Sequence, residues 1–259
     1  MAKESTAHTL TVALVICVVC SLLVAVPTVA LKPLQQEQKL LDKQKAVLTA
    51  AHLIDISARK KDIQAAFAAL DVRLVDLETG EFVEGDARSF DLASALKKDD
   101  SSRALAPEED VASIKRQELH APVYMKRNDQ GELQTVVIPV RGYGLWSTLY
   151  GFLALKGDAK TVEGLVFYQH AETPGLGGEV DNPKWRSLWK GKQIFDVNGD
   201  IAITVVKGNV EESDPNALHK VDGLAGATLT SRGVDALIKF WLSDKGFGPF
   251  LARVRSQGV

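Results

Sequence analysis

Hydrophobic and polar positions divide the chain into one long apolar stretch near its start and a longer part of mixed polarity. No Asp, Glu, Lys or Arg occurs between Glu4 and Lys32. At about 1.5 Å rise per residue, a helix over Thr9–Leu31 reaches about the 30 Å hydrocarbon thickness of a bilayer. Secretory signal peptides have a shorter apolar core of roughly 7–15 residues. We therefore expect an uncleaved membrane anchor over residues 1–33.

Behind this anchor the spacing of apolar residues predicts helices first. Leu34–Ile56 has the amphipathic pattern of a juxtamembrane helix. A second short helix follows at 62–70, and residues 72–77 and 82–83, around Glu78-Thr-Gly80, are predicted to form a strand and turn. Residues 86–118 are polar with little periodicity, which is typical of loops. We expect residues 34–120 to form one juxtamembrane subdomain.

From Pro122 onwards the alternation of apolar and polar residues predicts β-hairpins. The predicted strand pairs are 123–127 with 133–140, and 149–155 with 162–168. A further strand is expected at 201–206, and helices at 182–188 and 231–242. Hairpins with few helices indicate an α+β fold rather than a parallel βαβ array. Residues 121–259 are expected to form its main soluble domain.

Composition and charge exclude several classes of protein. The net charge of −2 does not fit a nucleic-acid binder, which needs a clustered cationic surface. Cys17 and Cys20 are spaced i and i+3 in the apolar stretch, where packing is a better explanation than a redox or metal pair. The five His are scattered, and the chain has no GxSxG, HExxH or Walker motif. We therefore expect neither a metal site nor a catalytic triad.

The candidate chemistry lies in three glycine-rich segments: 142–147, 172–179 and 222–231. Each has an ordinary structural explanation, and in the third Thr230 or Ser231 could simply cap the following helix. The third segment also suits a phosphate, because small residues allow close approach and a helix N-terminus attracts anions. The hydroxyl of Thr228 stands at that point, where it could hydrogen-bond a phosphate or be esterified by one.

These motifs resemble those of a known family. Asp222-Gly-Leu-Ala-Gly-Ala-Thr228 resembles the D-G-x-(S/T)-G-A-T signature at which flavin transferases join FMN through its phosphate to the last Thr. Glu172-Thr-Pro-Gly-Leu-Gly177 resembles a second motif of the same FMN-binding domain. With its N-terminal span and its length, the chain is similar to the C subunits of the sodium-translocating NADH:quinone reductases of bacterial membranes. Ala225 stands where the family more often has Ser.

The resemblance implies an electron-carrying flavoprotein with FMN held covalently by a phosphoester to Thr228. The other residues that it implies, or that we add as candidates for contact with the flavin, are Trp146, Ser147, Glu172, Thr173, Gly175, Leu176, Gly177, Lys207, Asp222, Gly223, Gly226, Ala227, Leu229 and Thr230. Lys207 follows the predicted strand 201–206 and is the candidate partner of the phosphate. Flavin chemistry needs no acid–base residues from the protein.

The resemblance also implies partners and a location. The partners are the other subunits of the membrane quinone reductase and a flavin transferase for maturation, without nucleic acid. Lys3 before the span and four lysines after it (Lys32, Lys39, Lys43 and Lys45) weakly favour a cytoplasmic domain. The family places that domain in the periplasm, which we adopt, with the anchor in the bacterial inner membrane. The alternatives are the G subunit of the related Rnf electron-transport complex and a membrane-anchored assembly protein without flavin.

Overall fold

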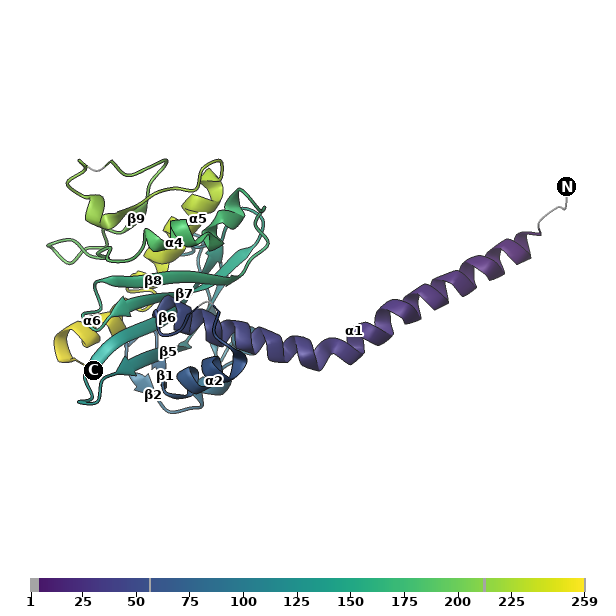
Figure 1. The fold of residues 1–259 in the computed structure, drawn as a ribbon, viewed down its shortest axis with the longest axis horizontal. Coiled ribbons are helices and arrows are strands. Elements are labelled where there is room, and N and C mark those ends of the chain that lie inside the picture. Colours follow the sequence, from purple (N-terminus) through teal and green to yellow (C-terminus); the bar gives the residue numbers. More distant parts are fainter. Residues whose placement is uncertain (1–4, 56, 212, 259) are drawn as a thin grey trace. The chain divides into compact units, whose positions relative to one another are not determined.

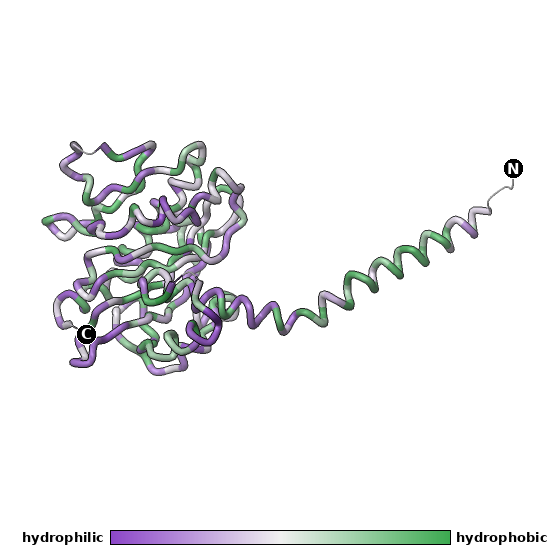
Figure 2. Tube along the Cα trace, viewed as in Figure 1, coloured by the Kyte–Doolittle hydropathy of each residue, from purple (hydrophilic) through white to green (hydrophobic). Residues whose placement is uncertain are grey.

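The chain begins with one long helix, in a computed structural model that describes residues 5–55, 57–211 and 213–258. Helix α1 (Thr6–Ala50) runs without interruption through Pro27 and Pro33. Its first part is long and apolar enough to cross a membrane, as the hydropathy colours of Figure 2 show. The predicted anchor and juxtamembrane helix are therefore one helix, which ends at Ala50. Ile56 and Lys3, which entered the predictions above, lie outside the described residues.

The chain divides into two compact units between Asp42 and Lys43, and the second unit contains every element after α1 (Figure 1). Its helices are α2 (Lys60–Ala68), α3 (Leu92–Ala95), α4 (Pro183–Ser187), α5 (Thr228–Leu242) and α6 (Gly248–Gln257), with short 3₁₀ turns at Ala87–Ser89, Gly177–Asp181 and Ala217–His219. Its strands are β1 (Asp71–Asp76), β2 (Phe82–Val83), β3 (Ser102–Ala104), β4 (Arg116–Glu118), β5 (His120–Arg127), β6 (Leu133–Tyr143), β7 (Thr148–Lys156), β8 (Val162–Gln169), β9 (Thr204–Val205) and β10 (Lys220–Val221).

A six-stranded antiparallel sheet forms the centre of this unit, in the order β2-β1-β5-β6-β7-β8. The two predicted hairpins are confirmed as β5–β6 and β7–β8. β1 and β2, from the segment before residue 120, belong to the same sheet as these hairpins. The α+β fold is confirmed.

The core lies between this sheet and the C-terminal helices. The predicted apolar face of α5 is confirmed, because all five of its residues are buried: Val234, Leu237, Ile238, Trp241 and Leu242. Trp241 also donates its indole N–H to the carbonyl of Arg141 on β6, at 2.7 Å. Burial of this face and that hydrogen bond hold α5 against β6, so the start of α5 has a defined place at the end of the sheet.

Two sequence predictions need correction. The β-branched run 201–206 forms only the two-residue strand β9, because β10, its parallel partner, is equally short. The polar segment 86–118 is not simply a loop, since it holds α3 and the β3–β4 pair. Asp86 and Asp91 begin its short helical turns by accepting backbone N–H groups.

Candidate functional site

The three glycine-rich segments meet at one end of the sheet. Segment 144–147 is the turn between β6 and β7, and the second motif begins shortly after β8 ends at Gln169. Because β6, β7 and β8 are neighbours, the turn and the end of β8 lie side by side. The start of α5 joins them, since a Cβ at Gly233 would stand 2.4 Å from the carbonyl oxygen of Tyr143. Segments far apart in sequence thus form one site.

Glu172 connects these three segments through its side chain. Its Oε1 accepts the backbone N–H groups of Leu145, Trp146 and Ser147 at 3.0, 2.9 and 3.3 Å. Its Oε2 accepts the hydroxyl of Thr230 on α5 at 2.7 Å. Glu172 is 5% exposed and Thr230 is fully buried. The carboxylate therefore binds the β6–β7 turn and the first turn of α5 to the second motif.

The charge of this carboxylate is stabilised by hydrogen-bond donors. Burial by itself would raise the pKa of Glu172, but the Thr230 hydroxyl and the three backbone N–H groups outweigh it and hold that pKa below the usual value. Donors of this kind favour the ionised form of a carboxylate. Glu172 is consequently a negative charge inside the site at neutral pH.

The segment 222–231 is a folded loop rather than a simple helix cap. Ala227 occupies the N-cap position, and its methyl group cannot accept a hydrogen bond. Thr230 is engaged by Glu172, and the Ser231 hydroxyl accepts the N–H of Leu224 at 2.8 Å. The interpretation of Thr230 or Ser231 as a cap is therefore wrong. Asp222 holds the adjoining loop by accepting the N–H of Val210 at 2.8 Å.

A hollow of ≈130 Å³ opens beside Thr228 at the N-terminus of α5. Lys207 and Arg232 line it, together with the backbone of Gly208 and Gly223. Among the described residues neither cation has an ion-pair or hydrogen-bond partner, and neither does the Thr228 hydroxyl. The hollow therefore combines two free positive charges, a hydroxyl and a helix N-terminus.

Asp235 of α5 brings Lys207 to this hollow. Its Oδ1 accepts the hydroxyl of Thr204 at 2.7 Å and the N–H of Val205 at 2.8 Å, both on β9. Gly223 packs so closely on the same segment that a Cβ there would stand 2.3 Å from the carbonyl oxygen of Val206. A side chain at position 223 is thereby excluded, and the loop before Thr228 lies directly on the segment that carries Lys207.

Exposed apolar side chains surround the same end of the sheet. Trp146 is 64% exposed, and Leu176 and Leu229 are also largely exposed. Leu176 reaches the third motif, since its Cδ2 lies 3.0 Å from the position of a Cβ at Gly226. Tyr143 and Leu145 add to this apolar surface. Solvent-exposed aromatic and aliphatic groups gathered beside a polar hollow are typical of a ligand site.

The remaining predicted residues Ser147, Thr173 and Gly175 shape the loops of the same region. The Ser147 hydroxyl accepts the N–H of Ala171 at 2.7 Å. The Thr173 carbonyl accepts the N–H groups of Leu176 and Gly178, which closes the turn that contains Gly175 with its positive φ of 76°. The Thr173 side chain is exposed, and within the described residues its hydroxyl has no hydrogen-bond partner.

Sequence reasoning did not single out Arg232, Tyr143 or Leu145, although the last two lie in the predicted segment 142–147. A signal for Arg232 was available, because a cation near a helix N-terminus opposes the helix dipole unless an anion is bound there. His170 was also overlooked. Its Nε2 lies 2.8 Å from Asp181 Oδ2, and its Nδ1 accepts the N–H of Glu172 at 3.2 Å.

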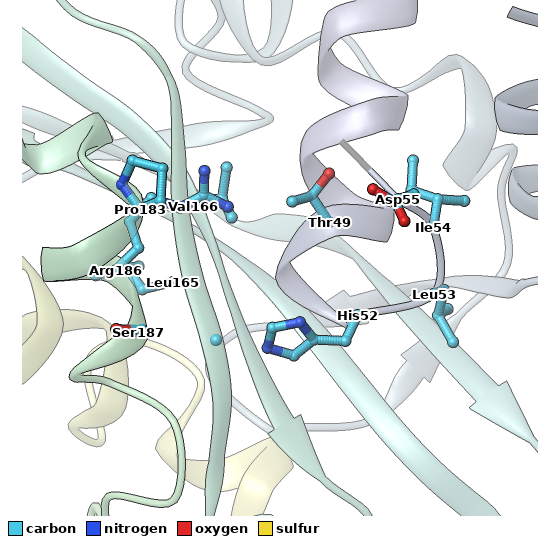
Figure 3. A pocket seen from close by; sticks show the side chains of 11 residues that line it. Thr49, His52, Leu53, Ile54, Asp55, Leu165, Val166, Pro183, Arg186 and Ser187 are labelled. Carbon is cyan, nitrogen blue, oxygen red and sulfur yellow. The ribbon is translucent and has the colours of Figure 1, made fainter. Parts of the chain in front are cut away.

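A larger hollow of ≈550 Å³ lies away from these motifs (Figure 3). Thr49, His52 and Asp55, around the end of α1, line it together with Arg186 of α4. None of the residues predicted to bind the cofactor lines this hollow. Over the described parts of the chain, no group of three or more His, Cys, Asp or Glu could hold a metal ion.

Known proteins resemble this chain in sequence and structure. A family model described as FMN-binding domain matches residues 144–243. This range includes segments 172–179 and 222–231, and all of segment 142–147 except its first two residues. The C subunit of the Na(+)-translocating NADH-quinone reductase of Pseudomonas aeruginosa is 53% identical over 98% of this chain and 97% of its own length. The Yersinia pestis protein of the same name is 47% identical over 99% of this chain and 96% of its own. The crystal structure of Shewanella oneidensis NqrC matches with a TM-score of 0.77 and 38% identity, over 85% of this chain and 100% of that one.

These similarities extend over nearly the whole chain, including the apolar helix, and the FMN-binding match coincides with the site described above. They support a membrane-anchored subunit of an oxidoreductase complex with further subunits as its partners. They favour this assignment over a flavin-free assembly protein and over the Rnf G subunit. The chain belongs to the family of C subunits of the Na(+)-translocating NADH-quinone reductases.

Proposed function

We propose that this chain holds FMN covalently through a phosphoester to Thr228 and relays electrons between other cofactors of the complex. The observation that carries the proposal is the hollow at Thr228, where a free hydroxyl, Lys207 and Arg232 converge on the N-terminus of a long helix. Each of these features favours a phosphate.

The residues at the hollow fit a phosphodiester. Ester formation from free FMN would release water, so the attachment needs an activated donor such as a flavin dinucleotide. In that reaction the Thr228 Oγ–P bond forms, the phosphoanhydride bond breaks, a nucleoside monophosphate leaves, and the hydroxyl proton passes to solvent. The product keeps one negative charge on phosphorus. Lys207, Arg232 and the first N–H groups of α5 would stabilise that charge.

The apolar surface beside the hollow fits the ring system of the flavin. Trp146, Leu176 and Leu229 would cover part of the isoalloxazine, and the exposed Thr173 hydroxyl would hydrogen-bond its polar edge. When bound, FMN supplies one- and two-electron transfer. The protein positions it, limits its contact with water, and sets the surrounding charge. These roles agree with the separation of the site into an ionic hollow and an apolar surface.

The attachment is tested by expressing the full chain together with a flavin transferase. A denaturing gel under ultraviolet light should show a fluorescent band for the unmodified chain and none for Thr228→Ala. Thr173→Ala is the matched control, because this exposed hydroxyl is in the same site but is not the attachment point; its band should persist. A fluorescent band from Thr228→Ala would exclude Thr228 as the attachment residue, and no band from the unmodified chain would contradict covalent flavin altogether.

The relay is tested in the assembled complex, purified through this subunit. After NADH is added, the flavin absorbance of the unmodified complex should decrease. The part of this decrease that comes from the flavin of this subunit should be missing in Thr228→Ala. Quinone reduction should fall strongly in the same variant. Unchanged quinone reduction without this flavin would contradict the relay.

The periplasmic location of the globular unit is part of the proposal. Val197 is fully exposed, so Val197→Cys provides a labelling site that leaves the core intact. A membrane-impermeant maleimide should label this variant in spheroplasts, with Cys17→Ser/Cys20→Ser as the background. Labelling only after membrane rupture would place the unit in the cytoplasm.

A further inference from the structure

The carboxylate of Glu172 accepts four hydrogen bonds from within the protein. One oxygen accepts three backbone N–H groups of the β6–β7 turn, and the other accepts the Thr230 hydroxyl. A carboxylate has about four acceptor positions in all. Oε1 therefore has no acceptor position left for a bound ligand, and the Thr230 hydroxyl holds Oε2 in place.

Two glycines leave the space that this carboxylate occupies. A Cβ at Gly144 would stand 2.6 Å from Oε1, and a Cβ at Gly177 would stand 2.6 Å from Oε2. Real Cβ atoms do not approach so closely, so both positions exclude larger residues as long as the carboxylate stays in place. The backbone on both sides thus makes room for the carboxylate, and its four hydrogen-bond donors hold it there.

The carboxylate is also a charge without a counter-ion. Within the described residues Glu172 forms no ion pair, and its donors are amides and a hydroxyl. The titratable group beside it is His170, which faces Asp181 through Nε2 and accepts the Glu172 N–H through Nδ1. Because Oε1 accepts the N–H of Trp146, the buried negative charge lies directly against the turn that carries Trp146, the residue proposed to cover the flavin.

We propose that Glu172 is a positioning residue that also sets the potential of the flavin: it holds the Trp146 turn against the first turn of α5, and its charge makes the bound flavin harder to reduce. The inference rests on the proposed function. Reduction adds negative charge to the flavin, and a nearby buried carboxylate opposes that change more strongly than an exposed one. The charge acts on the flavin electrostatically, and the hydrogen bonds act by positioning the turn. Neither requires contact between Glu172 and the flavin.

The test is the midpoint potential of the flavin in the full chain carrying Glu172→Gln, measured by spectroelectrochemistry. Gln keeps an oxygen for the three amides and removes the charge, so attachment should persist and the potential should become more positive. Glu179→Gln is the matched control, because it removes a carboxylate of the neighbouring 3₁₀ turn whose partner is Asn182, at 2.6 Å. Its shift should be clearly smaller. An unchanged potential in flavin-loaded Glu172→Gln would overturn the inference.

Thr230→Val gives a second measurement that does not depend on Glu172→Gln folding. It removes one donor from the same carboxylate and leaves the charge less well compensated, so the potential should become more negative than in the unmodified chain. A positive shift or no shift in Thr230→Val would contradict the inference. Failure of the proposed function has a different signature, since the unmodified chain would then carry no covalent flavin.

Discussion

Gly177 lies against Thr230 so closely that a Cβ on this glycine would stand 2.6 Å from the threonine Oγ1. Fifty-three positions separate the two residues in the sequence, yet their contact closes the site between the second motif and α5. Glu172 Oε2 is equally close to the same point. The packing at this point leaves room for a hydrogen atom only.

Gly177→Ala should therefore destabilise the chain by about 1–3 kcal/mol, because the new methyl group must displace Thr230 or Glu172. Gly178→Ala is the neighbouring control, since its Cβ would meet the Thr173 carbonyl oxygen at 3.1 Å and need only a small adjustment. The measurement is the free energy of unfolding in denaturant, together with the fraction of chain that carries flavin. Equal losses in the two variants would contradict the packing described here.

Truncation of Trp189 should destabilise the chain much more than truncation of Trp146. Trp146 is 64% exposed, whereas Trp189 is completely buried in the core. Trp189→Ala should cost about 3–5 kcal/mol of stability, and Trp146→Ala should stay within about 0.5 kcal/mol.

For the attached flavin, truncation of Trp146 should matter more than truncation of Trp189. If Trp146 covers the isoalloxazine, Trp146→Ala should change the absorption and fluorescence of the attached flavin while the unfolding midpoint is retained. Loss of an aromatic neighbour commonly relieves quenching, so the fluorescence should rise. An unaltered flavin spectrum in Trp146→Ala would remove Trp146 from the site.

His170 should make the stability of the second motif depend on pH. The hydrogen bond to Asp181 raises the pKa of His170 above its ordinary 6.5, burial opposes this rise, and the charges of Asp181 and Glu172 add to it. A raised pKa in the folded state means that the contribution to stability is complete below about pH 6.5 and is lost as the pH rises through the folded-state value. Asp181→Asn should therefore destabilise the chain at about pH 6 and have much less effect at about pH 9.

The direct measurement is an NMR titration of the His170 ring. Its pKa should fall in Asp181→Asn, with His219 as an internal control, because the ring of His219 lies 2.8 Å from the Gln193 carbonyl oxygen instead of a carboxylate. A His170 pKa that is the same in both chains would show that Asp181 does not govern it.

Lys207 and Arg232 should distinguish flavins with and without phosphate. In the Thr228→Ala background, where binding is non-covalent, Lys207→Met and Arg232→Met should each weaken FMN binding about fivefold, or on the order of 1 kcal/mol. Riboflavin, which has no phosphate, should bind equally well to all of these variants. Lys190→Met is the control, because Lys190 is exposed and does not line the hollow. Equal losses for FMN and riboflavin would show that the two cations do not act on the phosphate.

Much of the fold could be predicted from the sequence, because its hairpins join strands that are adjacent in the chain. β5–β6 and β7–β8 each join strands that are adjacent in sequence, and alternation with a turn defines such pairs. The apolar face of α5 was equally clear from its helical spacing. Strand β9 was overestimated, because its length depends on β10, and no local pattern reveals how long a distant partner is.

The sequence by itself determined the anchor, the α+β class and the position of Thr228 in its motif, since each depends on composition or on neighbouring residues. Tertiary structure alone decided what the site residues do. It turned the carboxylate of Glu172 inward to three amides and Thr230, and it brought Lys207 to Thr228 through Asp235. It also left Arg232 free beside the same hollow. Hydrogen bonds and close contacts between distant segments depend on three-dimensional packing, which a linear motif does not encode.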